Sequence, residues 1–239
     1  MKNTVIFDLD GLLVDSEIIS YKLYCDLAEK YDRHFSIEDY IHHYSGKTEA
    51  CNMETLIHKY QLPVSVQDGL SFISMREKEY LKNGIALKQG AAGLLSYLKR
   101  NQYKILLASS SSMERAVHIL SRSGIGAFFD YLVFGTDVKR GKPYPDIFLK
   151  ACAYAKEPPE NCLVLEDSEA GIQAAYSAGI DVICIPDLKT PGREYLKMAA
   201  ARLDSLEDVI SWLKNCSALR SVAGDRCEYP DAGWRTCSF

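Results

Sequence analysis

Residues 5–16 read VIFDLDGLLVDS, a run of apolar residues that ends in two carboxylates and a glycine. An apolar run without polar alternation, such as TVIF at 4–7, is typical of a strand covered on both faces in a parallel sheet. Because residues two apart on an extended chain point to the same side, Asp8 and Asp10 can face one site beyond the strand end, where Gly11 permits a sharp turn. Like charges at one site raise a pKa unless a cation lies between them. The stretch therefore predicts a buried strand that leads into a cation site.

Four further apolar runs follow along the chain: ILLA at 105–108, YLVF at 131–134, CLVL at 162–165 and VICI at 182–185. Helical patterns separate them. Residues 144–155 place their apolar side chains on one helical stripe, and residues 167–179 begin with cap-type residues and end at a glycine. Alternating strands and helices predict an α/β fold, a doubly wound parallel sheet with a Rossmann-like core.

One interval breaks this alternation. Between residues 16 and 87 the sequence shows amphipathic helical patterns and no convincing buried strand. Ile19, Leu23 and Leu27 recur at every fourth residue, and the segments around 36–43, 47–60 and 66–82 also look helical. We expect a helical cap domain over 16–87, inserted into an α/β core made of 1–15 and 88–215. An insertion at the carboxyl end of a strand stands over the ligand crevice of such a sheet.

The C-terminal residues show a different pattern. A last helix is predicted at 202–215, with Leu206, Val209, Ile210 and Leu213 as its buried stripe. Residues 216–239 have no periodicity, so we expect a loosely ordered tail. The alternative, a segment docked through Trp234 and Phe239 or joined by a cysteine pair, stays open.

Composition limits the classes of partner. The 239 residues carry a net charge of −4, with both signs interspersed, so a nucleic-acid or membrane-surface partner is not expected. No apolar run approaches the roughly 20 residues of a membrane span, and the N-terminal residues lack a secretory pattern. We therefore expect a cytoplasmic protein, and a monomer is the default. The cysteines from Cys25 to Cys184 are scattered and form no close-spaced pair, so we expect reduced packing residues rather than a zinc site.

A second pair of acids, Glu166 and Asp167, directly follows the apolar run CLVL. Four acids at the ends of two neighbouring parallel strands would form an oxygen-rich site of the kind that Mg²⁺ prefers. Each pair has a simpler explanation, since Asp8 and Asp10 could belong to an ordinary turn, and Glu166 and Asp167 could be exposed acids that cap the next helix. The conjunction of both pairs, each at a strand end, favours the metal site.

Two more polar residues lie at expected strand or helix ends. Ser109 ends the run ILLAS and precedes a helix, whose N-terminal N–H groups can receive an anion. Lys142 lies in the turn RGKPYP just before another helix. Taken alone, Ser109 could be a helix N-cap and Lys142 a solvated loop lysine. Together with a metal ion they would form a receptor for a phosphate dianion.

The four motifs FDLDG, ASS, GKPYPD and LEDSEAG occur in this order, and over residues 3–215 the chain resembles the haloacid dehalogenase-like hydrolase superfamily. The resemblance is to the branch with a helical cap that includes β-phosphoglucomutase and related phosphatases. It implies phosphoryl transfer through an aspartyl-phosphate intermediate and Mg²⁺ as the cofactor. The implied catalytic residues are Asp8 as nucleophile, Asp10 as general acid and base, and Ser109 and Lys142 as phosphate binders. The implied metal ligands are Asp8, the Asp10 backbone carbonyl, Glu166 and Asp167.

Within this superfamily the sequence favours a phosphatase. Dehalogenases lack an acid two residues after the nucleophile, whereas Asp10 is present here. Mutases that resemble β-phosphoglucomutase have a histidine early in the first cap helix and an arginine in the cap loop, where this chain has Ser20 and Glu49. A carboxylate at the second position should repel a bisphosphate sugar. We expect a small sugar or polyol phosphate as substrate, with a mutase as the alternative and a non-catalytic binding protein as a remote one. The expected substrate contacts are Leu9, Gly46, Lys47, Glu49 and Ser110.

Overall fold

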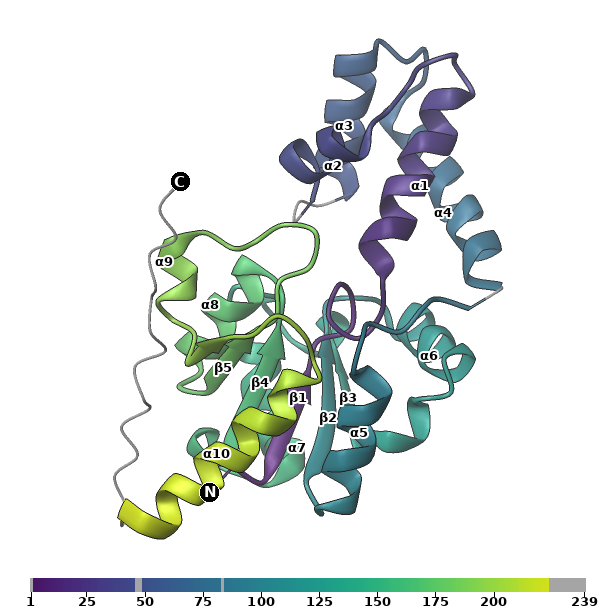
Figure 1. Ribbon diagram of the computed structural model, residues 1–239. Coiled ribbons are helices and arrows are strands. Elements are labelled where there is room, and N and C mark those ends of the chain that lie inside the picture. Colours follow the sequence, from purple (N-terminus) through teal and green to yellow (C-terminus); the bar gives the residue numbers. More distant parts are fainter. Residues whose placement is uncertain (1, 46–48, 83, 224–239) are drawn as a thin grey trace.

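A six-stranded, fully parallel sheet forms the centre of the protein, in the order β3-β2-β1-β4-β5-β6. The computed structural model describes residues 2–45, 49–82 and 84–223, the last eight by their backbone alone. The five predicted strands are confirmed, and the doubly wound α/β fold with them (Figure 1). The sixth strand was not predicted, because its two residues carry no apolar run. The strands are β1 (Thr4–Phe7), β2 (Lys104–Ser109), β3 (Tyr131–Phe134), β4 (Cys162–Glu166), β5 (Asp181–Cys184) and β6 (Ala201–Arg202).

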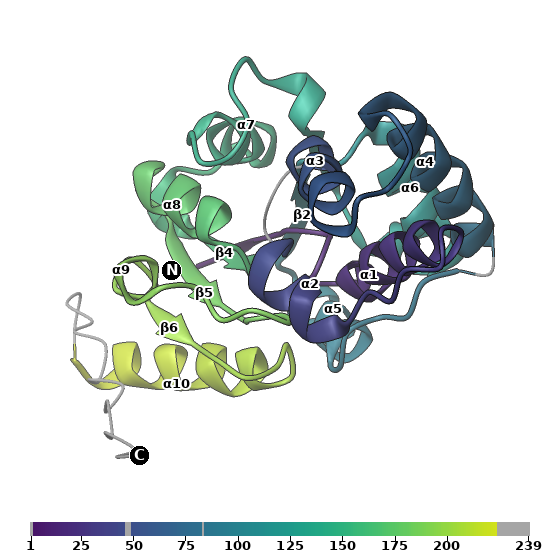
Figure 2. The same cartoon turned by 90° about the horizontal axis from the view of Figure 1, so that it is seen from above.

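Alternate residues of the strands enter two separate hydrophobic cores, one on each face of the sheet. In β1, Val5 and Phe7 pack with helices α5 (Ala91–Arg100), α6 (Met113–Arg122) and α10 (Asp208–Ala223). Ile6 packs on the other face with α7 (Asp146–Ala155) and α8 (Glu169–Ser177). Figure 2 shows α5 and α10 on one side of the sheet and α7 and α8 on the other. Two covered faces explain why the strands lack polar alternation.

Shorter elements complete the α/β core. They are the single-turn helix α9 (Arg193–Leu196) and three 3₁₀ turns, η1 (Gly126–Phe128), η2 (Gly135–Asp137) and η3 (Pro159–Asn161).

Four helices between β1 and α5 stand above the carboxyl edge of the sheet (Figure 1). They are α1 (Ser16–Glu29), α2 (Ile37–His43), α3 (Glu49–Tyr60) and α4 (Val66–Lys82). The predicted stripe of α1 is confirmed, since Ile19, Leu23 and Leu27 are buried. The two connections to the core run side by side, with backbone hydrogen bonds from Asp15 N–H to the Ala86 carbonyl and from Lys88 N–H to the Leu13 carbonyl. This arrangement agrees with an inserted cap, whose extent of 16–87 stays a prediction.

The C-terminal prediction needs correction. The last helix was expected at 202–215, but it begins at Asp208, because Ala201–Arg202 pair with β5 as strand β6. Leu206, Val209 and Leu213 are buried as expected, whereas Ile210 is only partly buried. The helix continues to Ala223, so the prediction of a loose tail is wrong for 216–223, a segment with the good helix formers Ala, Leu and Arg. The rest of that tail, with Trp234 and Phe239, lies outside the described residues.

The prediction that the cysteines are packing residues is confirmed for the buried ones and wrong for Cys51, which is exposed. Cys152, Cys162 and Cys184 are buried, Cys25 is partly buried, and none of these four forms a disulfide. Within residues 2–45, 49–82 and 84–223, no helix has both the length and the apolar character needed to cross a membrane.

Candidate active site

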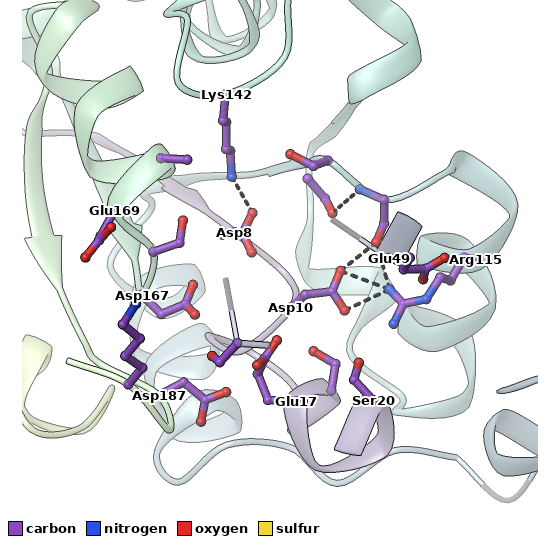
Figure 3. Close-up of a pocket in the computed structure, with 18 of the residues that line it drawn as sticks. Asp8, Asp10, Glu17, Ser20, Glu49, Arg115, Lys142, Asp167, Glu169 and Asp187 are labelled. Carbon is purple, nitrogen blue, oxygen red and sulfur yellow. Dashed lines mark hydrogen bonds and ion pairs between the residues drawn. The ribbon is translucent and has the colours of Figure 1, made fainter. Parts of the chain in front are cut away.

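The carboxyl ends of β1, β2 and β4 meet where the strand order reverses, which is where ligands bind in open α/β sheets. A cavity of about 750 Å³ lies there, between the sheet edge and the cap. Figure 3 shows side chains from core and cap turned into it. The predicted residues that line this cavity are Asp8, Asp10, Ser20, Glu49, Ser109, Ser110, Lys142 and Asp167.

Lys142 forms a buried ion-pair cluster with two of the predicted acids. Its side chain is 6% exposed, and its ammonium donates to Asp8 Oδ1 and, at 2.6 Å, to Glu166 Oε1. Burial opposes the charge of Lys142, but the two carboxylates outweigh it and raise the pKa of the ammonium. The alternative of a solvated loop lysine is therefore wrong.

Glu166 is fully buried, and both of its oxygens are engaged. Oε1 accepts from Lys142, and Oε2 accepts at 3.0 Å from the backbone N–H groups of Asp167 and Ser168 and from the Ser168 hydroxyl. A Cβ on Gly171 would lie 1.9 Å from the Glu166 carboxyl carbon, so this packing requires a glycine in α8. The alternative of an exposed capping acid is wrong for Glu166. Of the predicted acid pair, Asp167 is the one that lines the cavity.

Asp10 is held from the other side of the cavity. Arg115, in the first turn of α6, donates from Nη1 to both Asp10 oxygens at 2.7 and 2.9 Å, and the Ser111 hydroxyl also donates to Asp10. Burial raises the pKa of Asp10, but Arg115 and Ser111 outweigh it, so the pKa lies below its ordinary value. Asp10 is therefore held as a carboxylate.

The same arginine connects the core with the cap. Arg115 Nε donates to Glu77 Oε1 of α4 at 2.8 Å. The sequence reasoning missed Arg115 and Glu77, because neither lies at a strand end. An arginine in the first turn of a helix that begins at the serine-rich end of β2 was the available signal for Arg115.

Ser109 occupies the end of β2 and is 1% exposed. Its Oγ accepts from the Ser111 N–H at 3.1 Å. The N-cap of α6 is Ser112, whose Oγ accepts from the Arg115 N–H at 3.3 Å. The alternative assignment of Ser109 as a helix cap is therefore wrong, and its place at the cavity wall agrees with a phosphate contact.

The other predicted substrate contacts have different outcomes. Ser110 and Glu49 line the cavity, and both are exposed to solvent there. Leu9 is fully buried in the hydrophobic core and does not line the cavity, so a contact through its side chain is wrong. The alternation of a strand explains this, because Leu9 points away from the side that Asp8 and Asp10 share. Gly46 and Lys47 lie outside the described residues.

Three further acids of the cavity were not predicted: Glu17, Glu169 and Asp187. Glu17, at the start of α1, accepts a hydrogen bond from the Tyr40 hydroxyl at 3.0 Å. Asp187 follows β5, and the rule applied to β1 and β4, that acids gather at carboxyl ends of strands, would have found it.

The acids around the end of β1 fit a divalent cation. Burial, together with Glu166 and Asp10, raises the pKa of Asp8 to about 7 despite Lys142. Burial and the neighbouring carboxylates Glu166, Asp8 and Asp187 also hold the pKa of Asp167 well above its usual range. A cation bound among these carboxylates would relieve this repulsion and favour their charged forms.

The ligand set is smaller than the sequence indicated. No three His, Cys, Asp or Glu side chains in the described parts of the chain form a ready metal-binding group. Lys142 and the backbone N–H groups of Asp167 and Ser168 already bind the oxygens of Glu166. The remaining candidate metal ligands are the carboxylates of Asp8 and Asp167 and the backbone carbonyl of Asp10. This set still fits Mg²⁺, which keeps several waters and binds proteins through one or two carboxylates.

The fold and the cavity are those of an α/β enzyme with its active site at the sheet edge. The chain belongs to the haloacid dehalogenase-like hydrolases, because the model of that family matches residues 5–185. The resemblance seen in the motifs is thereby confirmed, and a non-catalytic protein is disfavoured.

Individual proteins of the family are similar over most of the chain. A phosphorylated carbohydrates phosphatase of Thermotoga maritima is 30% identical over 88% of this chain and 97% of its own length. A β-phosphoglucomutase of Bacillus subtilis is 35% identical over 74% of this chain and 80% of its own. Among solved structures, a Thermotoga maritima protein provisionally named β-phosphoglucomutase has a TM-score of 0.78 at 28% identity, over 90% of this chain and 99% of its own.

Proposed function

We propose that this protein is a Mg²⁺-dependent phosphatase that hydrolyses a small phosphorylated metabolite of the sugar or polyol phosphate class. The observation that carries this proposal is the buried contact between Lys142 and Asp8 at the end of β1, with Asp10 two residues further on. A carboxylate cannot readily approach a phosphate dianion unless fixed positive charge reduces their repulsion, and Lys142 supplies that charge. The similarity to a phosphorylated carbohydrates phosphatase supports the same class of substrate.

The proposed reaction has two displacements. First, an oxygen of Asp8 forms a bond to phosphorus while the bond from phosphorus to the substrate oxygen breaks, which gives an aspartyl-phosphate. Then a water attacks phosphorus, and the bond to Asp8 breaks. In both steps Lys142 neutralises charge on the phosphoryl oxygens, and Ser109 contributes a hydrogen bond. Mg²⁺, held by Asp8, Asp167 and the Asp10 carbonyl, supplies further neutralisation of phosphate charge when it is bound.

Asp10 moves the protons in this scheme. Its carboxylate form, held by Arg115 and Ser111, suits the second step, in which it takes a proton from the attacking water. The first step needs a protonated Asp10 that gives its proton to the leaving alkoxide. We infer that Asp10 turns away from Arg115 for that step, because the guanidinium stabilises the carboxylate form.

The cap wall of the cavity favours a substrate with one phosphate. Among its described residues it presents Glu17, Glu49 and Glu77 together with the hydroxyls of Ser20 and Ser45. Carboxylates and hydroxyls accept hydrogen bonds from sugar or polyol hydroxyls, whereas carboxylates repel a second phosphate. A bisphosphate is the intermediate that a sugar phosphate mutase must hold, so the wall favours a phosphatase. The mutase stays the second candidate because of the similarity to the Bacillus subtilis enzyme.

Release of inorganic phosphate from a substrate panel tests this proposal. The panel contains hexose 6-phosphates, polyol phosphates and hexose bisphosphates, each with Mg²⁺ and with a chelator. We expect Mg²⁺-dependent release from the monophosphates and much slower release from the bisphosphates. Absence of release from every compound would contradict the phosphatase, and conversion of β-glucose 1-phosphate to glucose 6-phosphate would establish the mutase instead.

A further inference from the structure

Asp187 presents a buried carboxylate oxygen without a hydrogen-bond partner. Its side chain is 5% exposed, and Lys88 donates to Oδ1, but Oδ2 has no hydrogen-bond partner in the described part of the chain. Buried polar atoms without a partner are rare in folded proteins, because the lost hydration of such an atom costs about 1–3 kcal/mol. Oδ2 of Asp187 lacks a hydrogen-bond partner among residues 2–45, 49–82 and 84–223.

This oxygen lies beside the predicted metal ligand Asp167. The position of a Cβ on Gly11 would be 2.4 Å from Asp167 Oδ2 and 3.1 Å from Asp187 Oδ2, so both oxygens crowd the same point. Gly11 has a φ of +78° and no side chain, and both features let the two acids approach the loop after β1. Figure 3 shows both carboxylates at the side of the cavity that faces away from Arg115. Two carboxylates this close need positive charge or a hydrogen-bond donor between them.

Lys88 fixes Asp187 in this place. Its ammonium contacts Asp187 and lies 3.7 Å from Asp15, and its backbone N–H is bonded to the Leu13 carbonyl at the base of the cap. With Oδ1 held by Lys88, Asp187 cannot turn Oδ2 toward solvent without breaking that bond. The contact with Lys88, which lies outside the cavity, thus holds the unpartnered oxygen beside Asp167 and Gly11.

We propose that Asp187 is an outer acceptor of the Mg²⁺ site, with Oδ2 receiving a hydrogen bond from a water of the hydrated ion that Asp167 binds. This inference rests on the metal of the proposed function and assigns Asp187 to it. Mg²⁺ gives up its waters reluctantly, so acceptors placed around the hydration shell contribute to its binding. Loss of such an outer partner typically weakens metal binding 10- to 100-fold.

Isothermal titration of Mg²⁺ into the substrate-free protein tests the proposal without any turnover. We expect Asp187→Asn to bind Mg²⁺ about 10- to 100-fold more weakly than the wild type. Asp15→Asn is the matched control, because it removes the other carboxylate near Lys88 but not one that lines the cavity, and its affinity should stay within about twofold. Asp187→Ser, which places no amide against Asp167, should show the same loss if the Asn variant does not fold.

Three results would overturn the proposal: wild-type affinity in the Asp187 variants, an equal loss in Asp15→Asn, or no Mg²⁺ binding by the wild type. The first result would mean that a proton shared between Asp167 and Asp187 satisfies the oxygen. A parallel assay of phosphate release separates this inference from the proposed function. If the wild type and Asp187→Asn differ in Mg²⁺ affinity but neither releases phosphate, the phosphatase is refuted and the role of Asp187 stands.

Discussion

At the scale of single residues, Lys142 has two roles, one in stability and one in the proposed reaction. It neutralises Asp8 and Glu166 in a buried place, and in the proposed reaction it also neutralises the phosphate. The buried cluster exists because each carboxylate has a partner, and removal of one partner leaves buried charge uncompensated.

We therefore predict that Lys142→Met lowers the free energy of unfolding by about 3–5 kcal/mol and reduces kcat/KM by at least about 100-fold. Urea unfolding and phosphate release measure the two effects. Lys139→Met is the control, because Lys139 is an exposed lysine of the same loop and should change neither quantity appreciably. Full activity of Lys142→Met would remove the lysine from the mechanism.

At the scale of elements, helix α8 is shaped by the acid that precedes it. Glycine inside a helix normally destabilises it by about 0.5–1 kcal/mol relative to alanine. At Gly171 the sign should reverse, because a Cβ there would lie 1.9 Å from the carboxyl carbon of Glu166.

We predict that Gly171→Ala destabilises the protein by about 1–3 kcal/mol and lowers activity by displacing Glu166 from Lys142. Gly93→Ala in α5, where nothing lies within 4 Å of the added Cβ, should instead stabilise by about 0.5–1 kcal/mol. Thermal unfolding of both variants checks the contrast. A stabilised Gly171→Ala would show that Glu166 has room to move.

A second prediction at this scale concerns the amino edge of the sheet. Glu157 accepts from Lys104 of β2 at 2.7 Å and from Asn161 of η3 at 3.1 Å. Hydrogen bonds from Lys104, Asn3 and Asn161 lower the pKa of Glu157 from 4.5 to about 2. A carboxylate whose pKa is lowered by folding stabilises the folded state above the unfolded pKa, and this contribution is lost as the pH falls through the folded pKa.

Glu157→Gln should accordingly be less stable than the wild type near neutral pH. The difference should shrink as the pH falls from 4.5 toward 2, the window between the two pKa values. Urea midpoints of both proteins across this range measure it. A difference that is independent of pH would show that the charge of Glu157 contributes nothing.

Five of the strands could be predicted because each has a continuous apolar run. Such a run is required where helices cover both faces of the sheet. The two-residue strand β6 and the part of α10 after Asn215 could not be predicted. So short a strand, and a helical segment of such mixed composition, have no distinctive sequence pattern. The site residues that lie at the ends of strands could also be predicted from the sequence. Arg115 and Glu77 lie on helices: the fold of the core brings Arg115 of α6 to Asp10, and the packing of the cap on the core brings Glu77 of α4 to Arg115.

At the scale of the whole molecule, the ion pair of Glu77 with Arg115 joins cap and core beside Asp10. We predict that Glu77→Gln raises KM by up to about fivefold, because a partly exposed ion pair contributes up to about 1 kcal/mol to the closed arrangement. Steady-state kinetics measure the change. Glu79→Gln, which removes an exposed acid from the same helix, is the control, and an equal effect of both variants would contradict a closing role.

In the proposed reaction Asp8 carries the phosphoryl group during turnover, while the monomeric state and the cytoplasmic location stay predictions. Rapid acid quench of the enzyme with a substrate labelled in its phosphate, followed by peptide mapping, tests this claim most directly. We expect transient label on the peptide that contains Asp8 and none in Asp8→Asn, which should remain folded and lose turnover. Label on another residue, or turnover that persists in Asp8→Asn, would contradict it.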